Sequence, residues 1–139
     1  SEGLLEELGA ELRIKGHQVH YTKNQQQMID SLMEKFESDP YAPPSYKQSV
    51  ELIGEDLVKT LIDTDRIIQL SEDVLLQEPI FQEMKTAAIS HIQDHGGITL
   101  AEFRDKFNTS RKYALALLEY LDQTGVTIRQ GDIRKLRRK

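Results

Sequence analysis

The 139-residue sequence contains no cysteine, and this absence excludes disulfide bonds, thiolate metal ligands and a cysteine nucleophile. No apolar run approaches the roughly 18 residues that a membrane span requires. Residues 1–3, Ser-Glu-Gly, lack the basic and apolar regions of a secretory signal. The glycine-rich phosphate loop and the Gly-x-Ser-x-Gly elbow are also missing. We therefore expect a cytoplasmic protein with no membrane contact, no catalytic activity and no cofactor.

Length and composition favour a folded chain with one ordinary domain or two small ones. Hydrophobic residues make up 38% and charged residues 29%, which is too apolar a mixture for a disordered protein. The net charge of −5 is unevenly spread, because residues 1–95 carry 8 basic and 18 acidic side chains, whereas residues 96–139 carry 10 and 5. Phosphate attraction depends on local charge, so the basic last third predicts a polyanion-binding end. A basic tail without a ligand is the alternative interpretation.

Apolar periodicity and turn residues predict the same order of elements twice, three helices followed by a β-hairpin. In residues 23–77 we expect helices at 24–38, 46–52 and from 55 onward, and a hairpin at 67–76. In residues 78–139 we expect helices at 80–95, 101–107 and 111–123, a short extended segment at 98–100, and a hairpin at 126–136. Residues 1–22 are interpreted as the helix end and hairpin of a preceding module. The predicted fold class is mainly α with small β-hairpins (α+β), built from tandem winged-helix modules.

The histidines offer little for metal binding. His91 and His95 stand four residues apart on a predicted helix, a spacing at which two imidazoles can share a metal. Ile92 occupies the position at which a zinc metalloprotease carries glutamate. His17 and His20 are expected on the surface of the first hairpin. We therefore predict no metal site.

The third helix of the second module opens with a sequence suited to anions. Residues 108–113 read NTSRKY, so a polar cap at Ser110 is followed by Arg111 and Lys112. A helix N-terminus offers free amide donors and a partial positive charge, and two cations strengthen both effects. The core stripe expected on the opposite side of the helix leaves Leu115 facing outward beside the two cations. This helix start is therefore predicted to bind phosphate.

Further cations are predicted around the same helix. Arg129 and Arg134 flank the turn of the last hairpin, and Arg104 lies on the preceding helix. Together they predict one basic patch, with scattered solvated charges as the alternative. The equivalent helix of the first module opens with Gly-Glu-Asp at residues 54–56, which would repel phosphate. The first module is therefore interpreted as a spacer or a docking platform.

Several segments resemble the C-terminal domain of bacterial selenocysteine-specific elongation factors. They are residues 98–105 (ITLAEFRD), 109–115 (TSRKYAL) and 118–122 (LEYLD), together with 40–44 (PYAPP) and 71–74 (SEDV) in the module before. The resemblance covers nearly the whole chain. It implies that the chain corresponds to the third and fourth winged-helix modules of that family, preceded by the end of the second. No GTP-binding motif is present, so the resemblance does not extend to the family's GTPase.

The resemblance also implies an RNA-binding site in the last module, because the family's hairpin contacts map onto residues 110–113 and 129–134 of this sequence. With the basic patch added, the predicted RNA-binding residues are Arg104, Ser110, Arg111, Lys112, Tyr113, Leu115, Arg129 and Arg134. Tyr113 could equally pack into the core.

The implied partner is an mRNA stem-loop, the selenocysteine insertion element, which tethers the factor to the selenoprotein message. The ribosome and selenocysteinyl-tRNA would be reached only through other parts of the full-length family protein, and a monomer is expected. Two other functions remain open. One is a winged helix that reads duplex DNA, and the other is a protein–protein interaction module whose working surface is the acidic first two thirds of the chain.

Overall fold

The first module consists of three helices and a two-stranded hairpin. They are α1 (Lys23–Ser38), α2 (Tyr46–Ile53), α3 (Glu55–Asp63), β1 (Ile67–Gln69) and β2 (Leu75–Gln77). Capping boxes start α1 and α2. The Thr22 and Ser45 side chains each accept a hydrogen bond from the backbone N–H three residues on, and the Gln25 and Gln48 side chains accept one from the backbone N–H of Thr22 and Ser45. The predicted helices therefore form with nearly the expected bounds.

The second module repeats this order and adds one short strand. Its elements are α4 (Glu78–His95), β3 (Ile98–Thr99), α5 (Leu100–Phe107), α6 (Arg111–Gln123), β4 (Thr127–Gln130) and β5 (Ile133–Leu136). The antiparallel sheet has the order β3-β5-β4, so β3 extends the β4–β5 hairpin, which we call the wing. Gly96 ends α4 in the left-handed conformation at φ 86°. The predicted class, mainly α with small hairpins in tandem winged-helix modules, is confirmed.

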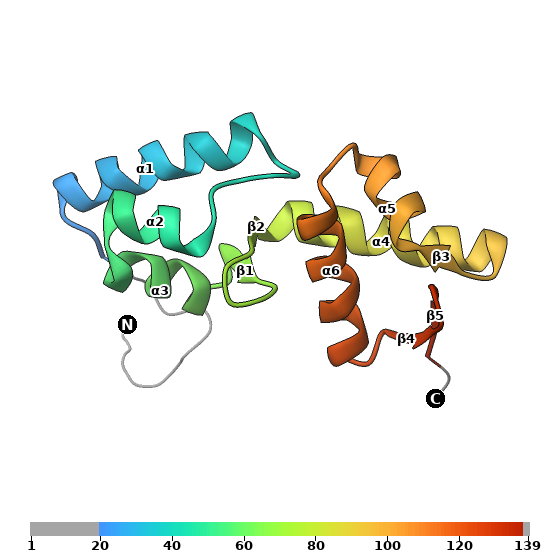
Figure 1. Ribbon diagram of the computed structural model, residues 1–139. Coiled ribbons are helices and arrows are strands. Elements are labelled where there is room, and N and C mark those ends of the chain that lie inside the picture. Colours follow the sequence, from blue (N-terminus) through green and yellow to red (C-terminus); the bar gives the residue numbers. More distant parts are fainter. Residues whose placement is uncertain (1–19, 138–139) are drawn as a thin grey trace.

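These elements come from a computed structural model that describes residues 20–137. The helix end and hairpin predicted for residues 1–22 fall outside that part, except for the last three residues. Figure 1 shows α1–α3 at one end of an elongated molecule and α4–α6 at the other, with the β1–β2 hairpin between them. Within residues 20–137, no helix has the length and apolarity needed to cross a membrane.

Each module has its own hydrophobic core, and the β1–β2 hairpin contributes to both. Ile67 and Leu75 belong to the core of α1, α2 and α3, where both are completely buried. Leu70, Val74 and Leu76 belong instead to the core of α4, α5 and α6. Successive strand residues point to opposite faces, so one hairpin can cover two sets of helices. The two modules are consequently joined by a continuous apolar contact.

The loop of residues 39–45, which we call the proline loop, strengthens this junction. Its Tyr41 ring packs against Phe107 of α5 with a centroid distance of 5.1 Å. The Tyr41 hydroxyl donates a 2.6 Å hydrogen bond to Glu83 Oε2 on α4. This hydrogen bond is the main reason that the pKa of Tyr41 is raised above its ordinary value. The proline loop of the first module is therefore fixed to the surface of the second.

Candidate nucleic-acid interface

The start of α6 carries half of the predicted binding residues. Ser110 caps the helix, because its hydroxyl accepts a bond from the Tyr113 backbone N–H at 3.4 Å. Arg111 and Lys112 are the first two helical residues, and both are exposed. No acidic side chain lies in the first turn. The positive end of the helix is therefore reinforced by its own side chains.

Arg111 and Leu115 lie one turn apart on α6 and form its accessible edge. Arg111 is exposed and has no ion-pair partner within the part of the chain that the structure describes. Leu115 is partly buried, so a portion of an apolar side chain accompanies the free cation. The expected core stripe is present, with Ala114, Leu117, Leu118 and Leu121 completely buried. The α6 edge therefore combines a free charge with an apolar contact.

Lys112 is not free, because an acidic residue of the first module lies beside it. Its Nζ is 3.5 Å from Asp73 Oδ2, and both side chains are about half exposed. The same Nζ lies 5.8 Å from the centre of the Tyr113 ring. Phosphate that approaches Lys112 therefore also approaches the Asp73 carboxylate.

Tyr113 connects the modules and is only partly accessible. Its hydroxyl donates a 2.6 Å hydrogen bond to the carbonyl oxygen of Pro43 in the proline loop. Burial, followed by the fields of Asp39 and Asp73, raises the pKa of Tyr113 above its ordinary value. The phenol therefore stays protonated and donating at neutral pH. Of the two roles that the sequence left open, the structure gives Tyr113 a packing role.

The two wing arginines have different surroundings. Arg129 is exposed, and its Nε donates a 2.9 Å bond to the Gly131 carbonyl oxygen at the wing turn. Arg134 is only 3% exposed, and its Nε donates to Asp122 Oδ2 at 3.2 Å. Thr127 donates to the other oxygen of Asp122 at 2.6 Å. Arg129 can therefore reach a ligand, whereas the structure places Arg134 in the scaffold and not on the predicted basic patch.

Arg104 lies on α5 and is partly exposed. Its guanidinium is 3.1 Å from Asp105 Oδ1, the carboxylate of the next residue. This exposed pair leaves Arg104 accessible, but its charge is largely balanced by its neighbour. It is therefore a weaker candidate for phosphate binding than Arg111.

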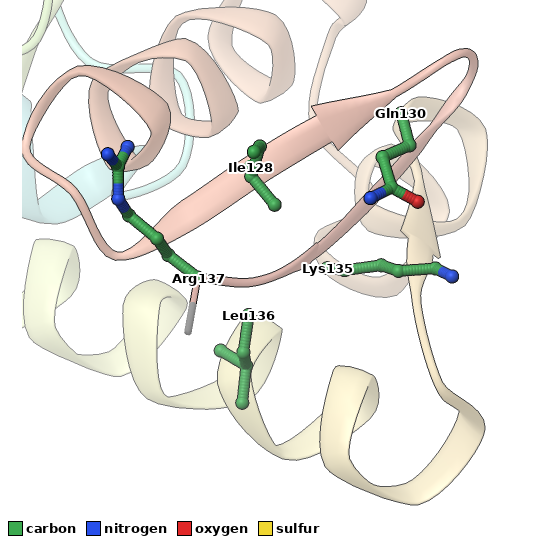
Figure 2. A pocket seen from close by; sticks show the side chains of 5 residues that line it. All are labelled: Ile128, Gln130, Lys135, Leu136 and Arg137. Atoms are coloured by element: carbon green, nitrogen blue, oxygen red, sulfur yellow. The ribbon is translucent and has the colours of Figure 1, made fainter. Parts of the chain in front are cut away.

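The outer face of the wing is a surface that the sequence analysis did not single out. Ile128 and Ile133 are 42% and 40% exposed. The register pairs Ile128 with Lys135 and Gln130 with Ile133, so all four side chains share one face. Figure 2 shows Ile128, Gln130 and Lys135 among the residues that line a pocket at the wing, together with Leu136 and with Arg137 just beyond β5. Strand alternation in residues 128–137 could have revealed this face.

The two helical histidines lie close together at the end of α4. The rings of His91 and His95 are 4.5 Å apart, and His91 Nε2 is 3.6 Å from Glu102 Oε1. A bond from the Thr99 backbone is the main cause that lowers the pKa of Glu102. Within residues 20–137 there is no group of three or more side chains that could hold a metal ion.

Known proteins resemble this chain in sequence and in fold. A family model described as "Elongation factor SelB, winged helix" matches residues 90–136, which contain the C-terminal third of α4 together with β3, α5, α6 and the wing. The second module is thus similar to the SelB winged-helix family. The resemblance predicted from the sequence motifs is confirmed. The matched segment of SelB is a winged-helix module and not a GTPase domain.

Relatives of the SelB family cover nearly the whole chain. A selenocysteine-specific elongation factor from Desulfomicrobium baculatum is 26% identical over 134 residues, which cover 92% of this chain and 21% of that protein. The mRNA-binding domain of elongation factor SelB from E. coli, solved in complex with SECIS RNA, is 20% identical with a TM-score of 0.68. That match covers 85% of this chain and 100% of the E. coli chain.

A second solved structure, the bacterial selenocysteine-specific elongation factor EF-Sec, is 19% identical with a TM-score of 0.63. It is matched over 84% of this chain and 19% of its own length. The chain thus spans about a fifth of the two long relatives. At these identities, the two structural matches show a shared fold.

Proposed function

We propose that this chain binds an mRNA stem-loop through its last winged-helix module and so tethers a selenocysteine-specific elongation factor to its message. One observation carries the proposal. The excess of basic side chains in an otherwise acidic chain, 10 basic against 5 acidic in residues 96–139, falls on the segment that matches the SelB winged-helix family model. The E. coli domain of the same fold was solved in complex with SECIS RNA, which supports RNA as the ligand.

The accessible edge of α6 and the wing would form the RNA-binding face. Arg111 and Lys112 would contact phosphates at the helix start, with Ser110 as the capping residue. Arg129 and Arg104 would add longer-range attraction. The deep and narrow major groove of A-form RNA excludes a helix, so sequence is read where loops and bulges splay bases. Leu115 supplies an apolar contact for such a base.

Two of the sequence-predicted residues act behind this face. Tyr113 holds the start of α6 against the proline loop, and Arg134 fixes the wing to the last turn of α6 through Asp122. They would stabilise the scaffold that carries the exposed cations. A direct contact with RNA is not proposed for either side chain.

The remaining parts of the proposal concern the full-length protein. The ribosome and selenocysteinyl-tRNA would be partners of regions outside this chain, which spans 21% of its D. baculatum relative. We expect the chain to act in the cytoplasm as a monomer. Sedimentation of the purified chain at micromolar concentration measures the oligomeric state directly.

A competition gel shift tests the proposed ligand. The chain is titrated into labelled stem-loop RNA, with unlabelled stem-loop, single-stranded RNA of the same composition, or duplex DNA as competitor at matched salt. We expect the stem-loop to compete best. Duplex DNA as the best competitor would instead indicate a DNA-binding winged helix.

The salt dependence of the same binding reaction tests the electrostatic part. The accessible cations can neutralise about three to five phosphates, each contributing a slope of roughly −0.7 to −0.9 in log K against log salt concentration. A binding constant independent of salt would contradict a phosphate-binding face.

A further inference from the structure

Asp73 is held by the first module at a fixed position beside α6. Its Oδ1 accepts a bond from the Lys47 backbone N–H at 3.1 Å, and its carbonyl oxygen accepts one from the Tyr46 backbone N–H at 3.2 Å. Both donors lie at the start of α2, where a carboxylate is favoured by the helix dipole. The remaining oxygen, Oδ2, lies 3.5 Å from Lys112 Nζ. The carboxylate is therefore presented to Lys112 by the backbone of another module.

One residue shortly before Lys112 and one directly after it are also hydrogen-bonded to the first module. Thr109 Oγ1 donates a 2.6 Å hydrogen bond to the Tyr41 carbonyl oxygen. Tyr113 makes its 2.6 Å bond to Pro43 one residue beyond Lys112. The backbone at the start of α6 is thus held at two points against the proline loop. Lys112 and Asp73 are consequently placed opposite each other by the fold and do not meet by chance.

The geometry of this pair permits exchange of partners. Both side chains are about half exposed, and an exposed ion pair contributes little to stability. Asp73 keeps the Lys47 hydrogen bond when Lys112 leaves, so its carboxylate is never without a donor. An anion that reaches the start of α6 can therefore replace Asp73 as the ion-pair partner of Lys112 with only a small loss of folding free energy.

We propose that Asp73 competes with RNA phosphate for Lys112, and that the first module thereby sets the affinity of the RNA-binding end. This inference rests on the proposed binding of RNA by the last module. A phosphate that binds Lys112 must displace the carboxylate and then remain within its repulsive field. The acidic first module thus weakens RNA binding through one defined contact, in addition to its general negative charge.

Asp73→Asn tests the competition, because the amide keeps an oxygen for the Lys47 N–H and loses the charge. We expect stem-loop RNA to bind about two- to fivefold more tightly than to the wild-type chain. Glu72→Gln is the matched control, since Glu72 is exposed in the same turn and its substitution removes the same charge. Both variants are titrated with stem-loop RNA at matched salt, and a thermal melt of each confirms the fold. Asp73→Ser, which retains a neutral oxygen acceptor, replaces the Asn variant if the melt shows unfolding.

Repeating both substitutions in a Lys112→Gln background separates the contact from general charge. Competition for Lys112 predicts that the Asp73→Asn gain disappears in this background, whereas the small effect of Glu72→Gln is the same in both. Stem-loop binding in which Asp73→Asn and Glu72→Gln behave alike would overturn the inference alone. A gain from Asp73→Asn that persists without Lys112 would also overturn it. Failure of the wild-type chain to bind stem-loop RNA would overturn the proposed function together with this inference.

Discussion

Reversing the charge of Arg111 is the most direct test of the RNA-binding face. Arg111 is the first residue of α6, is exposed, and forms no ion pair with the described residues 20–137. Its substitution by glutamate therefore breaks no ion pair within the described residues. An acid at a helix start also favours the helix dipole, so the fold should be retained. Lys112 is a poorer choice for this purpose, because an acid there would face Asp73 across the module junction.

Charge-assisted hydrogen bonds contribute roughly 1.5 to 3 kcal/mol each. Arg111→Glu removes one such contact and adds repulsion, so stem-loop RNA should bind at least about tenfold more weakly. One fewer phosphate is neutralised, so the slope of log K against log salt concentration should also become shallower by roughly 0.7 to 0.9. The melting temperature should stay the same or rise slightly.

Lys23→Glu provides a matched control in the same chain. Lys23 is also an exposed first residue of a helix, follows the N-cap Thr22, and changes the net charge by the same amount. It lies on α1 of the first module, away from the proposed face. Filter binding and thermal melts of both variants are compared at two salt concentrations. Equal weakening by the two substitutions would refute the placement of RNA on the α6 edge, as would unchanged affinity in Arg111→Glu.

Two scaffold predictions follow from the residues behind the RNA-binding face. The folded-state pKa of Tyr113 is raised above 10.0, chiefly by burial, so its stabilising contribution is complete below that pH and is lost as the pH rises through the higher folded value. Melts should therefore show a constant stability difference between wild type and Tyr113→Phe up to about pH 10, narrowing above it; a difference that widens there would contradict the assignment. Arg134→Met should lower the free energy of unfolding by roughly 1.5 to 3 kcal/mol, because Asp122 loses a charged donor. Below the melting temperature RNA affinity should remain within twofold, and a tenfold loss from a folded variant would place Arg134 at the interface.

The sequence predicts the elements well because their signals are local. The third helix of the second module was expected at residues 111–123, and α6 has these bounds. The Ser110 hydroxyl caps α6, and Gly96, which has no side chain, ends α4 in the left-handed conformation. Both features were expected from the residue types. Periodicity, capping and turn chemistry act over three or four residues, so they can be read without tertiary information.

The candidate site was harder to predict because its surroundings come from distant residues. The sequence predicts Lys112 as an exposed binding residue and leaves Tyr113 open between RNA binding and core packing. In the fold, Asp73 is the partner of Lys112, and the Pro43 carbonyl oxygen is the partner of Tyr113. Arg134 was expected at the surface, where arginine is usually found. In the structure only 3% of Arg134 is exposed, because its side chain is paired with Asp122 on α6. No local pattern encodes such pairs. The sequence therefore predicts which residues carry charge, and the fold decides which of those charges a ligand can reach.

The shared hairpin changes how the modules can be separated in experiments. If the first module were only a spacer, as one interpretation of the sequence has it, residues 78–139 could be studied alone. However, Leu70, Val74 and Leu76 of the first module are buried in the core of α4, α5 and α6. Burying one such side chain contributes roughly 1.5 to 3 kcal/mol, so three together approach the net stability of a small domain, about 5 to 15 kcal/mol. Weak RNA binding by residues 78–139 alone could then arise from the loss of these core side chains as readily as from the loss of contacts between the first module and RNA. Point substitutions in the whole chain, such as those at Asp73 and Arg111, keep both cores intact and measure the interface itself.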